Sequence, residues 1–563
     1  MNGSSLFLIM RRALPIYIRI YFVYRNHLFL PLIYFKALKL FYLFKGASSG
    51  KVENGTKTNE TFEGGSLVAD QKNNDVIEEA VGEKSVQWLE FRGGVFAATI
   101  PLVFFIVWAI TLSVLELVSE EALVLGIVIG ITIGLFFSKS KWSDYAQSLI
   151  SGMAQPVGVV AIIAWFWAGM FAQLLSAGGL VDGLIWFGFQ TGLEGGAFVG
   201  ITFLLAGLFA TAVGTGYGTV ATFGLLMYPA GIILGADPVI LLAAILSGAV
   251  FGDNLAPVSD TTIVSATTQE TDVPGVVRSR FKYSIAAAIP ALILFVIFGG
   301  GGEQGSQQVI SELQAQVSPD GLWMLLPFIL VLYLALSGQH LLTSLSWGII
   351  ASVVLIFISG KPMTDIIHIY QDEAGNAVVE GALMSGIGGY FNMAILILFI
   401  LAAAYLMEVA GTMEVIKNFF LRIIQRVVRR AELSIFGIVA FLNMFITINT
   451  AAEIAAAPFV RKLGKEMNIH PYRRANFLDT VTSSLGYIFP WSGGVLLAWA
   501  TIQGAANQYD FVPVISPIEV FPFVFQGWGL LIVMLIAALT GWGLRYEGKN
   551  GEEIKPADYE KQQ

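Results

Sequence analysis

The chain of 563 residues is 56% hydrophobic and 13% charged, its net charge is −8, and its mean hydropathy is +0.72. Soluble domains carry roughly twice that share of charged residues, so the composition disfavours a soluble enzyme. The absence of cysteine excludes disulfides and thiolate metal sites, and there is no GxxxxGK[ST], HExxH or GxSxG motif. We therefore expect no enzymatic activity, no cofactor and no nucleic-acid partner, but transport driven by an ion gradient.

The amino-terminal 52 residues contain eight Lys or Arg and no acidic residue. Their apolar stretch, 6–44, is interrupted by a cation every few residues, which predicts an amphipathic segment on the membrane surface rather than a span. Residues 53–90 are polar and rich in Gly, Asn and Glu, which is typical of a flexible linker.

From residue 95 onward, apolar stretches recur that are long enough to cross a hydrocarbon layer of about 30 Å. Two more apolar stretches, 197–228 and 433–460, are interrupted by polar residues or glycine, and each is interpreted as a re-entrant hairpin or a pair of short broken helices. The predicted fold class is an all-α polytopic membrane protein with about 10–12 transmembrane segments. The full spans are predicted near 95–115, 121–137, 150–176, 239–265, 284–300, 322–337, 342–358, 388–409, 477–500 and 524–544.

Two sets of spans are related by an internal repeat. Ser151-Gly152 precedes a long apolar span, and Ser385-Gly386, shifted by 234 residues, precedes a similar one. The same shift places Thr215 over Asn449, inside the two interrupted stretches. A constant offset over this distance predicts a duplication, in which both halves contribute to the functional site.

Loops at matching positions of the two halves carry opposite charge. The loop 138–145 is basic, whereas the matching loop near 361–380 is mainly acidic. Because cytoplasmic loops collect Lys and Arg, the halves should be inserted upside down relative to each other. The sequence thus predicts an inverted repeat whose loops 138–145, 270–282, 411–432 and 461–474 are cytoplasmic.

The predicted spans and loop charges also imply an organisation and a location. We expect a multi-pass plasma-membrane protein with both termini in the cytoplasm, which contacts the lipid bilayer and small inorganic cations and could form a homodimer. The segments are 1–52 (basic amphipathic segment), 53–90 (linker), 95–300 (membrane repeat 1), 301–321 (extracytoplasmic connector), 322–545 (membrane repeat 2) and 546–563 (cytoplasmic tail).

The densest group of polar residues within an apolar segment lies between Gly252 and Thr262. It supplies the carboxylates of Asp253 and Asp260, several hydroxyls, and Pro257, which leaves one backbone carbonyl without its helical partner. Such oxygen-rich groups are what hard cations like Na⁺ prefer. The alternative is a polar loop at a membrane face in which Asp260 caps a helix.

The segment FGDNLAPVSDTT (Phe251 to Thr262) resembles the GD-x-x-[SA]-P-x-SDTT signature of NhaC-type sodium/proton antiporters, within the ion transporter superfamily. Residues 210–224 are similar to the Thr/Gly-rich broken segment of that family, and the resemblance covers about residues 120–545. Asn254 and Ala256 stand where family members often carry lysine and serine. The resemblance implies exchange of Na⁺ for H⁺.

A mechanism for such exchange follows from the residues themselves. A deprotonated carboxylate can bind Na⁺, but the same group when protonated cannot, so the two cations compete for Asp253 and Asp260. Glu453, which lies among alanines, is the sharpest candidate of the second half, and its alternative role is an ion pair with Arg461. The predicted cation ligands are Thr215, Asp253, Ser259, Asp260, Thr261, Thr262, Asn449, Glu453, Asp479, Thr482 and Ser483.

Two other functions are alternatives. A sodium/proton-coupled carboxylate exchanger of the malate/lactate type would need a helix amino terminus or a basic residue at the membrane midplane. The predicted spans contain no basic residue, which favours the inorganic cation. A passive cation channel is suggested by Gly214 to Thr219, which is similar to the TVGYG filter of potassium channels. The matching stretch of the other half, 448–453, contains no glycine, which argues against that filter.

Overall fold

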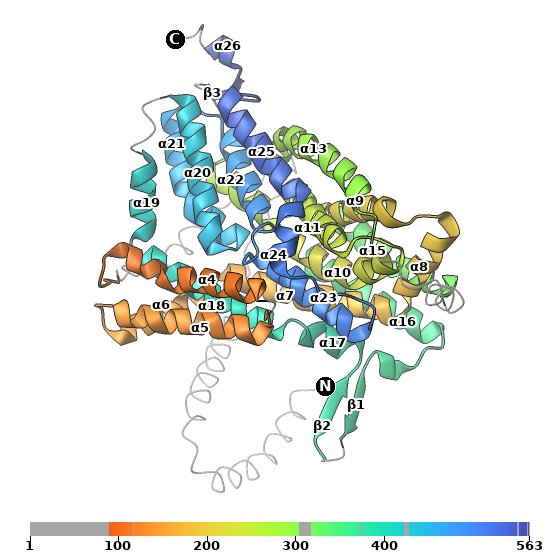
Figure 1. Cartoon of the computed structure of the whole chain (residues 1–563). Helices are drawn as coiled ribbons and strands as arrows, with labels where there is room; N and C mark the ends of the chain where they lie inside the picture. Colours follow the sequence, from red (N-terminus) through yellow and green to blue (C-terminus); the bar gives the residue numbers. More distant parts are fainter. Residues whose placement is uncertain are drawn as a thin grey trace, which may run out of the picture. The chain divides into compact units, whose positions relative to one another are not determined.

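The computed structural model describes residues 89–115, 117–302, 317–372, 375–421, 427–548, 551–559 and 561, all within one compact unit, Glu83–Gln563. The predicted basic segment, nearly all of the predicted linker and most of the predicted connector lie outside the described residues. The described part is helical apart from two small hairpins (Figure 1), so the predicted all-α polytopic class is confirmed.

The elements fall into two series along the chain. The first series contains η1 (Val95–Thr99), α4 (Ile100–Val114), α5 (Glu120–Phe137), α6 (Trp142–Met153), α7 (Pro156–Ala177), α8 (Leu180–Thr191), α9 (Gly195–Val213), α10 (Gly216–Ile233), α11 (Pro238–Leu255), α12 (Asp260–Thr268) and α13 (Val273–Phe298). The second series contains η2 (Pro319–Met324), α15 (Leu325–Leu336), α16 (Leu341–Ile358), η3 (Met363–Asp365), β1 (His368–Gln371), β2 (Ala377–Glu380), α17 (Ala382–Gly388), α18 (Phe391–Val409), α19 (Thr412–Leu421), α20 (Val428–Ile446), α21 (Asn449–Glu466), α22 (Pro471–Leu485), α23 (Gly493–Gln508), α24 (Pro517–Val520), η4 (Phe521–Phe523), α25 (Phe525–Thr540), β3 (Tyr546–Glu547), β4 (Glu553–Ile554) and α26 (Pro556–Tyr559).

Ten helical segments of the described chain are long and apolar enough to cross a membrane, and the bent pair of α24–η4 with α25 raises the number to eleven. This number agrees with the predicted 10–12 segments. The ten are Val95–Val114, Glu120–Phe137, Pro156–Ala177, Gly195–Val213, Gly216–Ile233, Pro238–Thr268, Val273–Phe298, Pro319–Leu336, Leu341–Ile358 and Ala382–Val409.

Both stretches predicted to be interrupted are pairs of helices. α9 and α10 are separated at Gly214 and Thr215, and α20 and α21 are separated at Thr447 and Ile448. The prediction that these helices are short is wrong, because each has 18 or 19 residues. Eighteen helical residues extend about 27 Å, which is close to the thickness of the hydrocarbon layer.

The breaks have local causes in the sequence. α9 ends at Gly214, whose φ of 76° is accessible to glycine at no steric cost, and Thr215 caps α10 by accepting a hydrogen bond from the Gly218 amide at 3.3 Å. α20 ends at Thr447 with a φ of 63°, a conformation that is strained for a β-branched residue. Strained backbone of this kind persists where the surrounding structure holds it in place, typically at functional sites.

The predicted continuous span 477–500 is wrong. α22 ends at Leu485 and α23 begins at Gly493, and the connection between them contains Gly486 and Pro490. A similar break separates α11 from α12 at residues 256–259, within the predicted span 239–265. The span prediction did not place these breaks because it follows the apolar character of a whole stretch, which continues on both sides of each break. Another span starts earlier than the predicted 284, since α13 begins at Val273.

The two series of helices exchange equivalent packing partners. α7 packs on α17 while α18 packs on α6, and α10 packs on α23 while α21 packs on α12. Likewise α11 packs on α25 while α22 packs on α13. Such reciprocal contacts are expected for two structurally equivalent halves related by a pseudo-twofold axis, and they support the predicted duplication. The inverted insertion of the halves stays a prediction.

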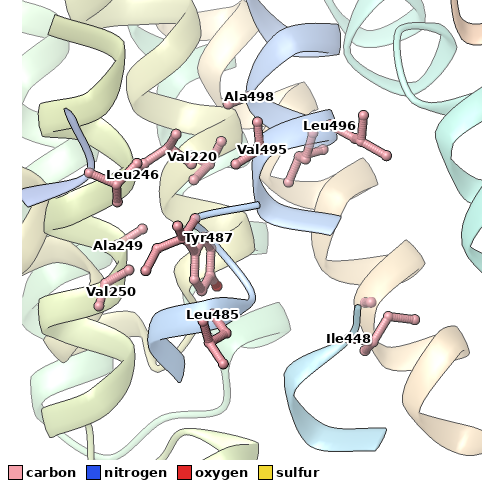
Figure 2. Packing of buried hydrophobic residues seen from close by; sticks show 14 of the residues in the cluster. Val220, Leu246, Ala249, Val250, Ile448, Leu485, Tyr487, Val495, Leu496 and Ala498 are labelled. Atoms are coloured by element: carbon pink, nitrogen blue, oxygen red, sulfur yellow. The ribbon is translucent and has the colours of Figure 1, made fainter. Parts of the chain in front are cut away.

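Burial distinguishes central helices from peripheral ones. Most residues of α10 and of the apolar part of Pro238–Thr268 are buried, whereas most residues in the apolar parts of α13 and α16 are not, and both helices expose large apolar side chains, as helices that face lipid do. Figure 2 shows the central packing, in which Val220 of α10, Leu246 of α11 and Val495 of α23 lie around the connection that carries Tyr487. Among the broken helices, α10 and α11 therefore belong to the innermost part of the described structure.

Candidate cation-binding site

All eleven predicted site residues lie at a helix break or on a helix beside one. Thr215 caps α10, Asp253 is near the end of α11, Ser259 immediately precedes α12, Asp260, Thr261 and Thr262 form the first turn of α12, Asn449 and Glu453 are in the first turns of α21, and Asp479, Thr482 and Ser483 are on α22. α12 packs on both α21 and α22, and α11 packs on α22. Both halves therefore contribute to one polar region.

Asp253 is a buried carboxylate whose hydrogen-bond partners are hydroxyl groups. It is 4% exposed, and it accepts hydrogen bonds from the Ser259 hydroxyl at 2.7 Å and from the Tyr487 hydroxyl at 3.3 Å. The Ser259 and Thr261 hydroxyl oxygens are 3.0 Å apart. Tyr487 was not among the predicted site residues, although its position between Gly486 and Pro490 in an apolar segment was a signal of a break.

Asp260 differs from Asp253 in its exposure. The Thr450 hydroxyl donates a hydrogen bond to the Asp260 carboxylate, yet Asp260 is exposed. The side chain of Asp260 is thus more exposed than that of Asp253. The physical reason is its position in the first turn of α12, on the helix face that also exposes Val258 and Ile263. Asp260 nevertheless interacts electrostatically with Asp253.

Asp479 forms a buried ion pair with Arg280 of α13, and both side chains are 0% exposed. One carboxylate oxygen of Asp479 also accepts a hydrogen bond from the Thr262 hydroxyl at 3.2 Å, and the other accepts one from the Ser483 hydroxyl at 2.6 Å. The predicted ligands Asp479, Thr262 and Ser483 thus form a cluster around Arg280 rather than around Asp253. A cation competing for Asp479 would have to displace a guanidinium.

Arg280 corrects the expectation that the membrane spans contain no basic residue. The sequence predicted it in a cytoplasmic loop, whereas it lies near the amino-terminal end of the span α13 and is fully buried. Its guanidinium donates to the Asn254 carbonyl at 2.7 Å, to Thr262 at 3.2 Å, to Ser265 at 3.3 Å and to Asn476 at 3.3 Å, in addition to Asp479. These protein acceptors occupy all three of its nitrogen atoms.

Glu453 is 0% exposed, and neither of its carboxylate oxygens has a hydrogen-bond partner among the described residues. The alternative of a pair with Arg461 is wrong, because Arg461 pairs instead with Glu270 at 3.2 Å. A hydrogen bond from Lys465, together with the charge of Arg461, lowers the pKa of Glu270 in the loop after α12. Those basic side chains are therefore already paired with a different acid.

The remaining predicted residues have local roles or lack partners. Thr215 caps α10, and the Thr482 hydroxyl donates to the Leu478 and Asp479 carbonyls of its own helix, at 3.0 Å each. The side-chain amide of Asn449 is buried, and neither its oxygen nor its nitrogen has a partner among the described residues. The hydroxyl groups of Thr215 and Thr482 therefore form local hydrogen bonds rather than bonds to Asp253.

A second buried ion pair lies outside this region. Arg473 donates to both carboxylate oxygens of Glu432, at 2.8 and 3.1 Å, and also to the Tyr283 hydroxyl. Arg473 was expected in the cytoplasmic loop 461–474, but it is 2% exposed because α22 begins at Pro471 and enters the protein core. This pair joins α20 and α22 through two side chains that were predicted to lie in loops, and the bond to Tyr283 adds α13.

The groups around Asp253 could bind a hard cation through one charged ligand and several neutral oxygens. No three side chains of His, Cys, Asp or Glu come together as a metal site anywhere in the described part of the chain. A cation at Asp253 would therefore take its other ligands from hydroxyl and carbonyl oxygens, such as those of Ser259 and Thr261. Such neutral oxygens suit Na⁺ and are poor ligands for transition metals.

Comparison with known proteins identifies related chains. The model of the Na⁺/H⁺ antiporter family matches residues 76–300 and again residues 275–528, so each half of the chain is covered.

The individual relatives are named for different transport activities. The malate-2H⁺/Na⁺-lactate antiporter of Bacillus subtilis is 27% identical over 58% of this chain and 71% of its own length. The arginine/ornithine antiporter ArcD of Halobacterium salinarum is 24% identical over 75% of this chain and 89% of its own length. The Na⁺/H⁺ antiporter NhaC of Alkalihalophilus pseudofirmus is 26% identical over 49% of this chain and 61% of its own length. All three are named as antiporters.

Proposed function

Because this chain belongs to the Na⁺/H⁺ antiporter family, we propose that it exchanges Na⁺ or Li⁺ for H⁺ across the plasma membrane by alternating access. The cation binds at the break between α11 and α12, and Asp253 is the carboxylate for which Na⁺ and H⁺ compete. The observation that carries this proposal is the burial of Asp253 among hydroxyl groups, without an ion pair to any basic residue of the described chain.

The exchange follows from the cost of burying charge. An ionised carboxylate in a medium of low polarity is strongly unfavourable unless a counter-charge accompanies it. Either Na⁺ or H⁺ removes that cost at Asp253, so the carrier changes conformation only when one of the two is bound. The exposed Asp260 receives the cation from water and transfers it to Asp253, with which it interacts electrostatically.

The presence of Arg280 does not favour an organic anion as the substrate. A buried arginine is the type of residue that would bind a carboxylate substrate, and the sequence-based argument that none is present no longer holds. However, the Arg280 guanidinium already donates to Asp479, to the Asn254 carbonyl and to three further protein groups. A substrate carboxylate would have to break these bonds, so we retain the inorganic cation as the substrate.

The channel alternative is disfavoured by the backbone at Gly214 to Thr219. A filter needs carbonyl oxygens that point into a pore, whereas residues from Gly216 onward begin the helix α10, whose carbonyls bond within the helix. The glycines instead allow close packing, since a methyl group on Gly216 would overlap the Tyr487 hydroxyl.

Everted membrane vesicles with a pH-sensitive dye test the proposal. Adding Na⁺ or Li⁺ to respiring vesicles should release stored protons. If malate or lactate releases the protons and Na⁺ alone does not, the carboxylate exchanger replaces this proposal. A cation flux that runs downhill without any dependence on the opposite ion would instead identify a channel.

Two substitutions then test the site. Asp253→Asn and Asp260→Asn should each abolish Na⁺-dependent proton release while the protein still inserts in the membrane, because amides carry no negative charge. Asp510→Asn serves as a control, since Asp510 is exposed in the loop after α23. Full activity of either site variant would remove that residue from the cation site.

A further inference from the structure

Glu453 is a buried carboxyl group that the cation site around Asp253 does not use. It lies on α21, three residues after Thr450, whose hydroxyl donates to Asp260. Three residues correspond to about 4.5 Å along a helix. Glu453 therefore lies nearly one turn further along α21 than Thr450, which contacts Asp260. It interacts electrostatically with Asp253, Asp260 and Asp479, and it is completely buried.

No basic side chain of the described residues neutralises Glu453. Arg461, on the same helix, pairs with Glu270 in the loop after α12. Arg280 is the basic residue that interacts with Glu453 electrostatically, but its ion pair is with Asp479. A buried carboxylate without a paired counter-charge is highly unfavourable, so Glu453 must bind a cation of its own or carry a proton.

The surroundings of Glu453 suit a proton rather than a sodium ion. Hard cations are held by several oxygens that converge on one point. The carboxylate oxygens of Glu453 have no polar partner within hydrogen-bonding distance in the described structure, whereas Asp253 has the hydroxyls of Ser259 and Tyr487. A proton needs only one carboxylate oxygen, and it converts the charged side chain into a neutral one.

We propose that Glu453 is a second proton-binding residue of the transporter, distinct from the cation site at Asp253. The two are coupled because a Na⁺ ion near Asp253 and Asp260 favours the ionised form of Glu453, with which both aspartates interact electrostatically. Sodium loading therefore releases the Glu453 proton together with the proton displaced from Asp253. This inference rests on the proposed function and adds to it a second proton for each sodium ion.

Proton release by the purified full-length protein measures this directly. Calorimetric titration with NaCl, in two buffers that differ in ionisation enthalpy, gives the number of protons released for each Na⁺ bound. The wild type should release about two protons, and Glu453→Gln, which mimics the protonated side chain, should release about one and still bind Na⁺. Glu466→Gln is the matched control, because Glu466 is an exposed acid on the same helix.

The possible results separate this inference from the proposed function. If the wild type binds Na⁺ and releases one proton or fewer, or if Glu453→Gln releases as many protons as the wild type, Glu453 is not a proton site. If the wild type neither binds Na⁺ nor releases protons, the proposed function itself fails. Should Glu453→Gln not fold, a wild-type release of one proton or fewer still overturns the inference, and Glu453→Asp, which retains an acid, should keep a release of about two protons.

Discussion

Removing either partner of the ion pair between Arg280 and Asp479 should strongly destabilise the protein. Both side chains are 0% exposed, so a single substitution leaves an uncompensated charge in the core. Breaking such a buried pair typically costs about 3–5 kcal/mol. Arg280→Gln additionally removes hydrogen bonds to Asn254 and Ser265, and should therefore fall in the upper part of that range.

The double substitution Arg280→Gln with Asp479→Asn should cost less than the sum of the single substitutions. It removes both charges and leaves neutral groups that can hydrogen-bond to each other, so we expect a coupling energy of about 2–4 kcal/mol. Thermal unfolding of the detergent-purified variants, followed by tryptophan fluorescence, provides the four stabilities that the cycle needs.

A surface pair provides the control for this cycle. Glu270 and Arg461 are 3.2 Å apart, but their side chains are 50% and 45% exposed. Exposed pairs contribute about 0–1 kcal/mol, so Glu270→Gln should change the unfolding temperature little. If the two core substitutions prove additive, or if they are as mild as Glu270→Gln, then the buried pair does not organise the site.

Two further predictions concern packing and pH. Gly252→Ala should destabilise the protein by about 1–3 kcal/mol. The new methyl group would overlap the Ala210 Cβ and lie 2.6 Å from the Gly207 carbonyl oxygen, which would push α11 away from α9. Thermal unfolding measures this effect, and an unchanged unfolding temperature would show that the two helices are not held in close contact. Burial lowers the pKa of His470, whose Nδ1 accepts a hydrogen bond from the Tyr472 amide at 3.3 Å, so the folded protein binds fewer protons there than the unfolded chain. The stability that His470 contributes is thus present above its ordinary pKa of about 6.5, and it is lost as the pH falls through that value towards the lowered pKa of the folded state. His470→Asn should therefore flatten the dependence of the unfolding temperature on pH over this range.

The architecture could largely be predicted from the sequence because membrane spans are determined locally. A hydrocarbon layer requires a long run of apolar residues with internally satisfied backbone groups, and that requirement is visible without knowledge of tertiary contacts. The prediction of broken helices also succeeded, because Gly214 and the polar residues near Thr447 interrupt apolar runs. All eleven predicted site residues lie at or next to breaks, although the sequence did not place the breaks between α11 and α12 and between α22 and α23.

Only the tertiary structure decided how the charges of the site are paired. Arg280 looked like part of a basic loop, and its role depends on a contact with Asp479, 199 residues further along the chain. In the same way, Asp260 is exposed although it lies within a predicted span, and Glu453 is buried without a partner among the described residues. The sequence determines which residues are polar within the membrane, whereas burial and pairing depend on helices that meet only after folding, because the electrostatic cost of a charge is set by its neighbours in space.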